Sequence, residues 1–354
     1  MDWQSGLAGQ RVFVTGGGGF IGRRLVAELV SAGAKVTALS RTSRPGAGGA
    51  TAVRGGLKDA DLLCEALKGH DVLFHLAYDV RASAAENLEG FEALMGEAER
   101  AGVGRVVHTS SIVVYNDWPE QDVTEASAMD RPGGSPYRQA KIEMERQLLG
   151  SSLPVAILQP TIVWGPGSAL WTDGLAESLA GGAVILPEPE GVLNGVYVDD
   201  VVQAMLRAAL VEDLGRERFI VNGPTGQRWS DLLGAYAQAI GKGSVRHEPL
   251  AAIEGRIGPK PEEGGDAGPS AAAKVSALAR SIIGRERFEA LVRMIKRRLA
   301  KGGDMYPDHH LLEVFAGSGW CSTQAAQSRL GYEPACDIAA GMEETGPYLK
   351  RRLG

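Results

Sequence analysis

Two residues four positions apart, Tyr137 and Lys141, are the most chemically suggestive pair in the sequence. Ser135 is a favourable N-cap and Pro136 a favourable first helical residue, so Tyr137 and Lys141 should lie one turn apart on one helix face. A free phenol, with a pKa of about 10, exchanges protons poorly at neutral pH. Because a nearby ammonium favours the phenolate, we expect Lys141 to lower the Tyr137 pKa and make it a general acid or base.

A serine supplies a third polar group. Ser111 ends the apolar run 105–111, and Tyr137 follows 26 residues later. Ligands of doubly wound sheets bind at the carboxyl ends of the strands. Alone, the Tyr–Lys spacing is a frequent chance pattern on a solvated helix. With Ser111 it predicts proton exchange with an alcohol or carbonyl.

Three glycines with the spacing G-x-x-G-x-x-G, Gly16, Gly19 and Gly22, follow the first predicted strand. In dinucleotide-binding proteins the first permits a tight turn, the second lets backbone approach a pyrophosphate, and the third lets helix pack on strand. The chain holds 48 glycines, so the string alone would be weak. Its position where the first strand meets the first helix predicts a dinucleotide site.

The end of the second predicted strand bears on which dinucleotide binds. Ser40 and Arg41 stand there with Arg44 close behind, and no acidic residue is present to hold a ribose 2′-hydroxyl. A guanidinium suits a 2′-phosphate, which it can bind through two parallel hydrogen bonds. We expect NADP, with NAD as the alternative if Arg41 is only a solvated loop residue.

The elements that must position these residues alternate along the chain. Apolar runs predict strands over 11–15, 35–40, 71–77, 105–111, 155–159 and 218–222, and helical spacing predicts helices over 20–32, 59–68, 84–101 and 136–149. This order predicts an α/β class fold, a doubly wound parallel Rossmann sheet with a smaller C-terminal substrate-binding region.

The same patterns predict how the chain divides. We expect 1–165 and 195–224 to form the dinucleotide-binding domain, and 166–194 with 225–354 to form the substrate-binding region. The Gly- and Pro-rich stretch 251–273 is predicted to be a mobile loop, and a basic amphipathic helix is predicted over 288–299.

Composition narrows the class of protein. The 354 residues are 44% hydrophobic and 23% charged, which is ordinary for a globular protein, and a net charge of −6 disfavours a nucleic-acid partner. No apolar run reaches the roughly 18 residues of a membrane span, and the first residues do not resemble a signal peptide, so we expect a cytoplasmic protein without stable membrane insertion. Three scattered cysteines and the pair His309–His310 lack a metal-ligand pattern, so no metal site is expected.

Over residues 10–242 the chain resembles the extended short-chain dehydrogenase/reductase family, of the NAD-dependent epimerase/dehydratase type. The strings that carry the resemblance are 15–22, 71–77, 87–90, 110–115, 136–141, 158–167 and 197–200, with a further match at 330–334. The resemblance implies that Tyr137 is the acid/base, that Lys141 also binds the nicotinamide ribose, and that Ser111 holds the reacting oxygen. The implied cofactor contacts are Gly16, Gly19, Phe20, Ile21, Gly22, Ser40, Arg41, Leu57, Leu76, Ala77, Lys141 and Pro160.

The family also implies a small-molecule substrate and a homodimer formed through helices 84–101 and 136–149. Tyr78, Trp164 and Trp171 are candidate substrate contacts, although core packing explains the two tryptophans equally well.

Departures from the family pattern narrow the reaction. Dehydratases carry an Asp-Glu pair where this chain has Ile112 and Val113, so we do not expect a 4,6-dehydratase. The stretch 193–196 lacks the arginine that often grips a sugar-nucleotide diphosphate, which disfavours such a substrate. Gln159 replaces a usual arginine and Gly56 a usual aspartate, and we expect neither to touch the chemistry.

Three functions stay open from the sequence. An epimerase-like enzyme would return the hydride to the other face of its ketone intermediate, whereas a net reductase would release its cofactor after each turnover. Arg41 and the missing diphosphate arginine favour the reductase. A non-catalytic NADP-sensing protein is the third, and the intact set of Ser111, Tyr137 and Lys141 argues against it.

Overall fold

The computed structural model describes residues 6–41, 48–259 and 303–354. Its centre is a seven-stranded sheet in the order β10-β6-β5-β4-β1-β2-β3, with every pairing parallel. The strands are β1 (Arg11–Thr15), β2 (Lys35–Ser40), β3 (Thr51–Arg54), β4 (Val72–His75), β5 (Arg105–Thr109), β6 (Val155–Pro160) and β10 (Arg216–Val221). The predicted Rossmann sheet is confirmed.

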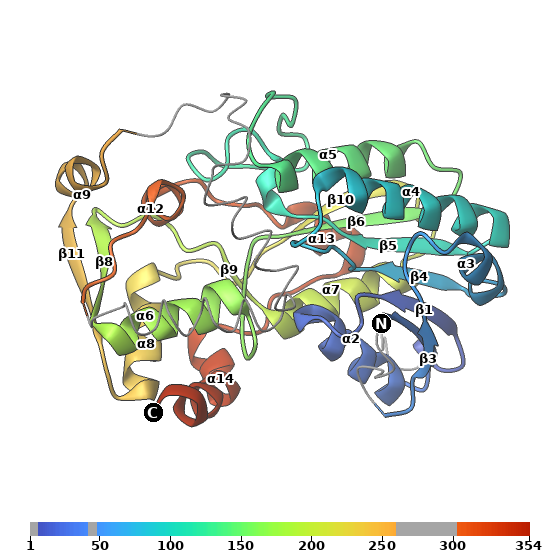
Figure 1. Ribbon diagram of the computed structural model, residues 1–354, viewed down its shortest axis with the longest axis horizontal. Helices are drawn as coiled ribbons and strands as arrows, with labels where there is room; N and C mark the ends of the chain where they lie inside the picture. Colours follow the sequence, from blue (N-terminus) through green and yellow to red (C-terminus); the bar gives the residue numbers. More distant parts are fainter. Residues whose placement is uncertain (1–5, 42–47, 260–302) are drawn as a thin grey trace, which may run out of the picture.

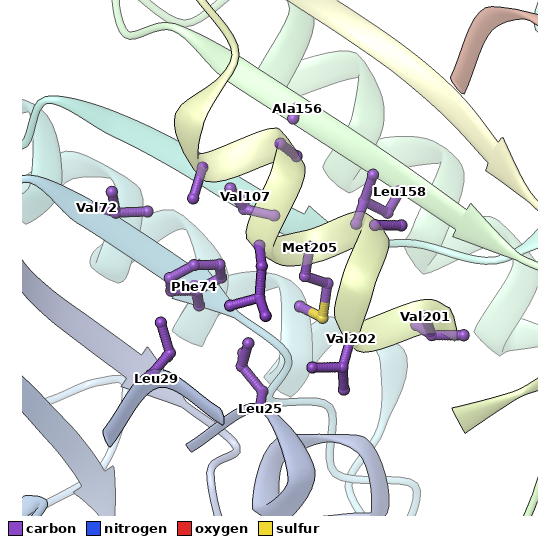
Figure 2. Packing of buried hydrophobic residues seen from close by; sticks show 14 of the residues in the cluster. Leu25, Leu29, Val72, Phe74, Val107, Ala156, Leu158, Val201, Val202 and Met205 are labelled. Atoms are coloured by element: carbon purple, nitrogen blue, oxygen red, sulfur yellow. The ribbon is translucent and has the colours of Figure 1, made fainter. Parts of the chain in front are cut away.

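Helices cover both faces of this sheet (Figure 1). One face carries α3 (Ala60–Ala66), α4 (Ala84–Ala101) and α5 (Pro136–Leu149), and the other carries α2 (Phe20–Ser31) and α7 (Val198–Leu210). Figure 2 shows side chains of α2 and α7, such as Leu25 and Met205, packed on Phe74 and Leu158 of the central strands. Because both faces are covered, β4 and β6 are buried at every residue, which explains their unbroken apolar runs.

The ends of α4 and α5 show why the sequence predicted these two helices with the observed bounds. Ser83 and Glu86 form a reciprocal capping box before α4, and Gly102 ends it at φ 67°, a left-handed conformation that favours glycine. Ser135 caps α5 by accepting from the Arg138 N–H, with Pro136 as its first residue. Since Tyr137 and Lys141 lie in the first two turns of α5, this cap fixes the start of the helix and so the positions from which both side chains project.

Of the remaining described elements, α13 (Gln324–Leu330) packs against β10 and α7, and most of the others form a second body of structure on the left in Figure 1. They include the parallel pairs β7 (Ile162–Trp164) with β9 (Gly195–Tyr197) and β8 (Ala183–Glu188) with β11 (Ser244–Pro249). The helices are η2 (Ala169–Gly174), α6 (Leu175–Gly181), α8 (Trp229–Ile240), α9 (Leu250–Ile257), α12 (His309–Ala316) and α14 (Ile338–Leu353). Trp164, Trp229, Tyr236 and Phe315 lie at the centre of its apolar cluster.

One prediction about an element was wrong, and one strand of the central sheet was missed. Residues 251–257 belong to helix α9 rather than to a mobile loop, because Ile253 is buried against Ile185 and Leu312. The edge strand β3 was not predicted, since its four residues alternate too little to stand out. The rest of the predicted loop from residue 260, the predicted basic helix 288–299 and Arg44 lie outside the described residues.

Two searches of the described residues concern membranes and metals. None of the helices in the described ranges is long and apolar enough to cross a bilayer. Within the same ranges, no group of three or more His, Cys, Asp and Glu side chains could hold a metal ion.

Candidate active site

The predicted site residues gather at one edge of the sheet, where the parallel strands end. The glycine turn follows β1, Ser40 and Arg41 stand at the end of β2, and Leu57 follows β3. The segment 76–78 follows β4, residue 111 follows β5, and residue 160 ends β6. The fold thus brings segments far apart in the sequence to the edge where doubly wound sheets bind ligands.

The glycine turn has the shape that a dinucleotide pyrophosphate needs. Gly16 has φ 73°, and a Cβ on it would lie 2.8 Å from the Ala77 backbone nitrogen. A Cβ on Gly22 would lie 2.1 Å from the Gly16 carbonyl oxygen. The helix can therefore lie this close to the turn only because residue 22 is a glycine. No described side chain caps the N-terminus of α2 at Gly19, which leaves its first N–H groups to face a phosphate.

Arg41 lies where the sequence placed it, but with a partner that the sequence did not reveal. Its side chain is 74% exposed, and its Nη1 lies 2.7 Å from Oδ2 of Asp79, beyond β4. Asn87 fixes the Asp79 backbone: its Oδ1 accepts from the Asp79 N–H at 2.8 Å, and its Nδ2 donates to the Asp79 carbonyl at 3.0 Å. Because β1 lies between β2 and β4, the Arg41–Asp79 ion pair spans the end of β1, which the glycine turn follows.

The three predicted catalytic residues meet at this edge. The Ser111 side chain lies near the Tyr137 hydroxyl, and Tyr78 packs edge-on against the Tyr137 ring with centroids 4.9 Å apart. The Lys141 Nζ lies 5.9 Å from the centroid of the Tyr137 ring and 5.3 Å from that of Tyr78. Thr109 accepts a hydrogen bond from the same Nζ through its carbonyl at 2.7 Å.

The expected lowering of the Tyr137 pKa is not found. Burial raises the pKa of Tyr137 to about 12, the nearby Ser111 side chain opposes this rise, and Tyr78 adds to it. The ammonium of Lys141 donates to Thr109 rather than to the phenol, and burial lowers its own pKa to about 8. A phenol with this raised pKa stays protonated at neutral pH, and it can give its proton to a stronger base, such as the alkoxide that forms when a carbonyl accepts a hydride.

Two histidines beneath Lys141 were not singled out from the sequence. His75 and His108, neighbours on β4 and β5, are buried and stack with ring centroids 5.2 Å apart. Burial and the Lys141 charge lower the pKa of His75 to about 3, and burial also lowers that of His108, so both rings are neutral. Thr15 Oγ1 lies 2.7 Å from Nδ1 of His75.

The candidate substrate residues separate in the structure. Tyr78 lies against Tyr137. Trp164 is fully buried in the second apolar cluster, edge-on to Tyr197 at 4.9 Å, which is the packing of a core residue. Trp171 is partly buried in η2, with its ring centroid 5.8 Å from that of Trp229.

Residues 12–222 match the model of the NAD dependent epimerase/dehydratase family. The chain belongs to this family. A 4-hydroxy-2-methyl-3-oxo-4-farnesyl-3,4-dihydroquinoline-1-oxide ketoreductase of Stigmatella aurantiaca is 30% identical over 60% of this chain and 68% of its own length. A 2-alkyl-3-oxoalkanoate reductase of Stenotrophomonas maltophilia is 30% identical over 60% of this chain and 71% of its own length.

Solved structures agree on the fold. An epimerase of Methanothermobacter thermautotrophicus superposes with a TM-score of 0.71 over 99% of this chain and 95% of its own, at 18% identity. The family match and the two named reductases show that the chain is an oxidoreductase that uses a nicotinamide cofactor.

Proposed function

We propose that this protein is an NADPH-dependent reductase of ketones with apolar substituents, in which Tyr137 donates the proton. The observation that carries the proposal is that Ser111 and Tyr137 lie near each other beside the buried Lys141. Two neighbouring hydroxyls at a ligand-binding edge can both hydrogen-bond one carbonyl oxygen.

In the proposed mechanism, the bound reduced nicotinamide supplies a hydride to the carbonyl carbon. Ser111 orients the carbonyl oxygen, and Tyr137 transfers its hydroxyl proton to that oxygen as the alcohol forms. The raised pKa of Tyr137 keeps the phenol protonated and ready to donate. Lys141 would hold the nicotinamide ribose and stabilise the phenolate that is left.

The cofactor would lie along the strand edge, with its pyrophosphate on the glycine turn and its adenosine 2′-phosphate at Arg41. The remaining predicted contacts, Phe20, Ile21, Ser40, Leu57, Leu76, Ala77 and Pro160, stay part of this proposal. The bare N-terminus of α2 and the glycine-only packing at Gly22 support it. So does the position of the Arg41 guanidinium at the edge, although binding a 2′-phosphate would require Arg41 to leave Asp79.

Three observations support an apolar ketone rather than a sugar nucleotide. The two similar reductases are named for farnesyl- and alkyl-bearing substrates. Apolar Ile112 and Val113 follow the catalytic serine, where elimination of water would need acidic groups. The ring of Tyr78 offers an apolar wall beside the Tyr137 hydroxyl. Trp171 stays in the proposed substrate contacts, and Trp164 does not because it is buried in the core.

We also retain the predicted domain division, the cytoplasmic location and the homodimer through α4 and α5 as proposals.

The test is NADPH consumption with a panel of 2-alkyl-3-oxo acids, aromatic ketones and steroid ketones, with UDP-glucose as the sugar-nucleotide arm. We expect steady oxidation of NADPH with at least one apolar ketone and none with UDP-glucose. Tyr137→Phe should lower kcat by about 100-fold or more with little change in NADPH affinity, because only the proton donor is lost. Tyr306→Phe, which removes a hydroxyl that bonds Glu248, is the matched control and should keep wild-type kcat.

Two results would refute the proposal. Unchanged turnover in Tyr137→Phe would remove the tyrosine from the mechanism. A nicotinamide that stays bound and is never consumed would favour the epimerase-like reaction over net reduction.

A further inference from the structure

One turn beyond Lys141 on α5 lies a carboxylate with no exposed surface. Glu145 is 0% exposed, and both of its oxygens are hydrogen-bonded. Gln159 Nε2 donates to the two oxygens at 3.0 and 3.1 Å, and Arg218 Nε donates at 2.8 Å. The Ser110 hydroxyl completes the set. A buried charge is tolerated when paired and hydrogen-bonded in this way.

These donors come from three neighbouring strands. Ser110 directly follows β5, Gln159 lies on β6 and Arg218 on β10, and the sheet order is β10-β6-β5. One helical side chain therefore fastens α5 across three adjacent strands. Ser110 is also the neighbour of Ser111, so the carboxylate that holds α5 also holds the backbone that carries the catalytic serine.

Glu145 is in addition the single anion that acts on Lys141 among the described residues. The other groups that face Lys141 carry no charge at neutral pH. These are His75 on β4, His108 on β5, Tyr78 after β4 and Tyr137 on its own helix. Burial works against the ammonium form of Lys141, and only the Glu145 carboxylate opposes it.

We propose that Glu145 is a positioning residue: it fixes α5 on strands β5, β6 and β10 so that Tyr137 lies near Ser111, and it keeps the buried Lys141 charged. The inference rests on the proposed function for its catalytic consequence. Its effect on Lys141 exists without cofactor or substrate and can be measured in the free protein.

The experiment follows the lysine directly. Protein labelled with ¹³C at lysine Cε is titrated by NMR, with the Lys141 signal assigned from Lys141→Arg. We expect a midpoint at about pH 8 in the wild type. In Glu145→Gln, which keeps the shape and removes the charge, the midpoint should fall by about one pH unit. The alkaline limb of the pH profile of kcat/KM should shift to lower pH by the same amount as the Lys141 midpoint.

Two further variants separate charge from structure. Arg218→Met also breaks the buried ion pair but leaves the carboxylate, so the Lys141 midpoint should not fall. Glu145→Gln combined with Arg218→Met removes both charges and avoids an unpaired guanidinium, so it should fold even if the single variant does not. Its Lys141 midpoint should fall as in Glu145→Gln.

A Lys141 midpoint at or above the wild-type value in the folded variants that carry Glu145→Gln would overturn the proposal. Equal shifts in Arg218→Met and Glu145→Gln would also overturn it, because they would reflect a structural change common to both. The proposed function fails separately, if no ketone is reduced while the Lys141 midpoint still falls.

Discussion

Gly22→Ala isolates one methyl group at the cofactor turn. The added Cβ would lie 2.1 Å from the Gly16 carbonyl oxygen and 2.8 Å from the Gly17 Cα, and both are backbone atoms. The turn and helix α2 must separate by about 1 Å to relieve the contact, in an interior that is close-packed. Such overpacking costs about 1–3 kcal/mol, against a gain of about 1 kcal/mol for alanine over glycine within a helix. We expect a net loss of up to about 2 kcal/mol in the free energy of unfolding.

The matched control is Gly18→Ala, four residues before Gly22 in the same turn. A Cβ there meets nothing within 4 Å, and no left-handed φ is required. Chemical denaturation and NADPH titration by fluorescence would be measured for both variants. Gly22→Ala should bind NADPH about tenfold more weakly or worse, whereas Gly18→Ala should bind like the wild type. Equal affinity and equal midpoints in the two variants would refute the claim that this helix must lie against the turn.

Two other predictions concern charge. Arg41→Ala should lower the preference for NADPH over NADH by about tenfold or more, and Asp79→Asn, which releases the Arg41 guanidinium, should raise that preference. The preference is measured as the ratio of the dissociation constants of the two cofactors. An unchanged ratio in Arg41→Ala would contradict the prediction. Since His75 and His108 gain protons on unfolding, the free energy of unfolding should fall below about pH 6.5, by up to about 1.4 kcal/mol per pH unit for each histidine. His108→Leu, which removes two buried nitrogens without hydrogen-bond partners in the described residues, should flatten that slope in denaturation at pH 4–7, and an unchanged slope would exclude His108 as its source.

Most of the sheet and its helices could be predicted because their signals are local. The strands β1 and β2 and the helices α4 and α5 have the predicted bounds, fixed by apolar runs and by caps such as Ser83 and Ser135. Helix α9 could not be predicted, since glycines and prolines dominate its surroundings and its burial comes from Ile185 and Leu312 far along the chain. The glycine and proline content of this segment favours a loop, but its contacts with residues distant in the sequence stabilise a helix.

The meeting of Ser111, Tyr137 and Lys141 at one sheet edge was predicted, but the electrostatics around them were not. Ser111, Tyr137 and Lys141 could be found because strand ends and helical spacing bring them together. The direction of the Tyr137 pKa depends on burial, and the sequence does not reveal how deeply a helix start is covered. Gln159, expected not to touch the chemistry, bonds a carboxylate one turn from Lys141. Only the spacing of 141 and 145, which repeats that of 137 and 141, could have pointed to Glu145.

The three large apolar clusters have a consequence for the order in which a growing chain can bury them. The cluster beneath α3, α4 and α5 draws every buried member from residues 13–157, so it can close while the rest of the protein is still being made. The cluster beneath α2 and α7 waits for Tyr332, and the cluster around Trp164 waits for Leu349 in the last helix. Helix α5, which carries Tyr137 and Lys141, packs on the early face, against β5 and β6. Its ion pair with Arg218 on β10 forms later, so during synthesis Tyr137 and Lys141 are present before the contact that we propose positions them.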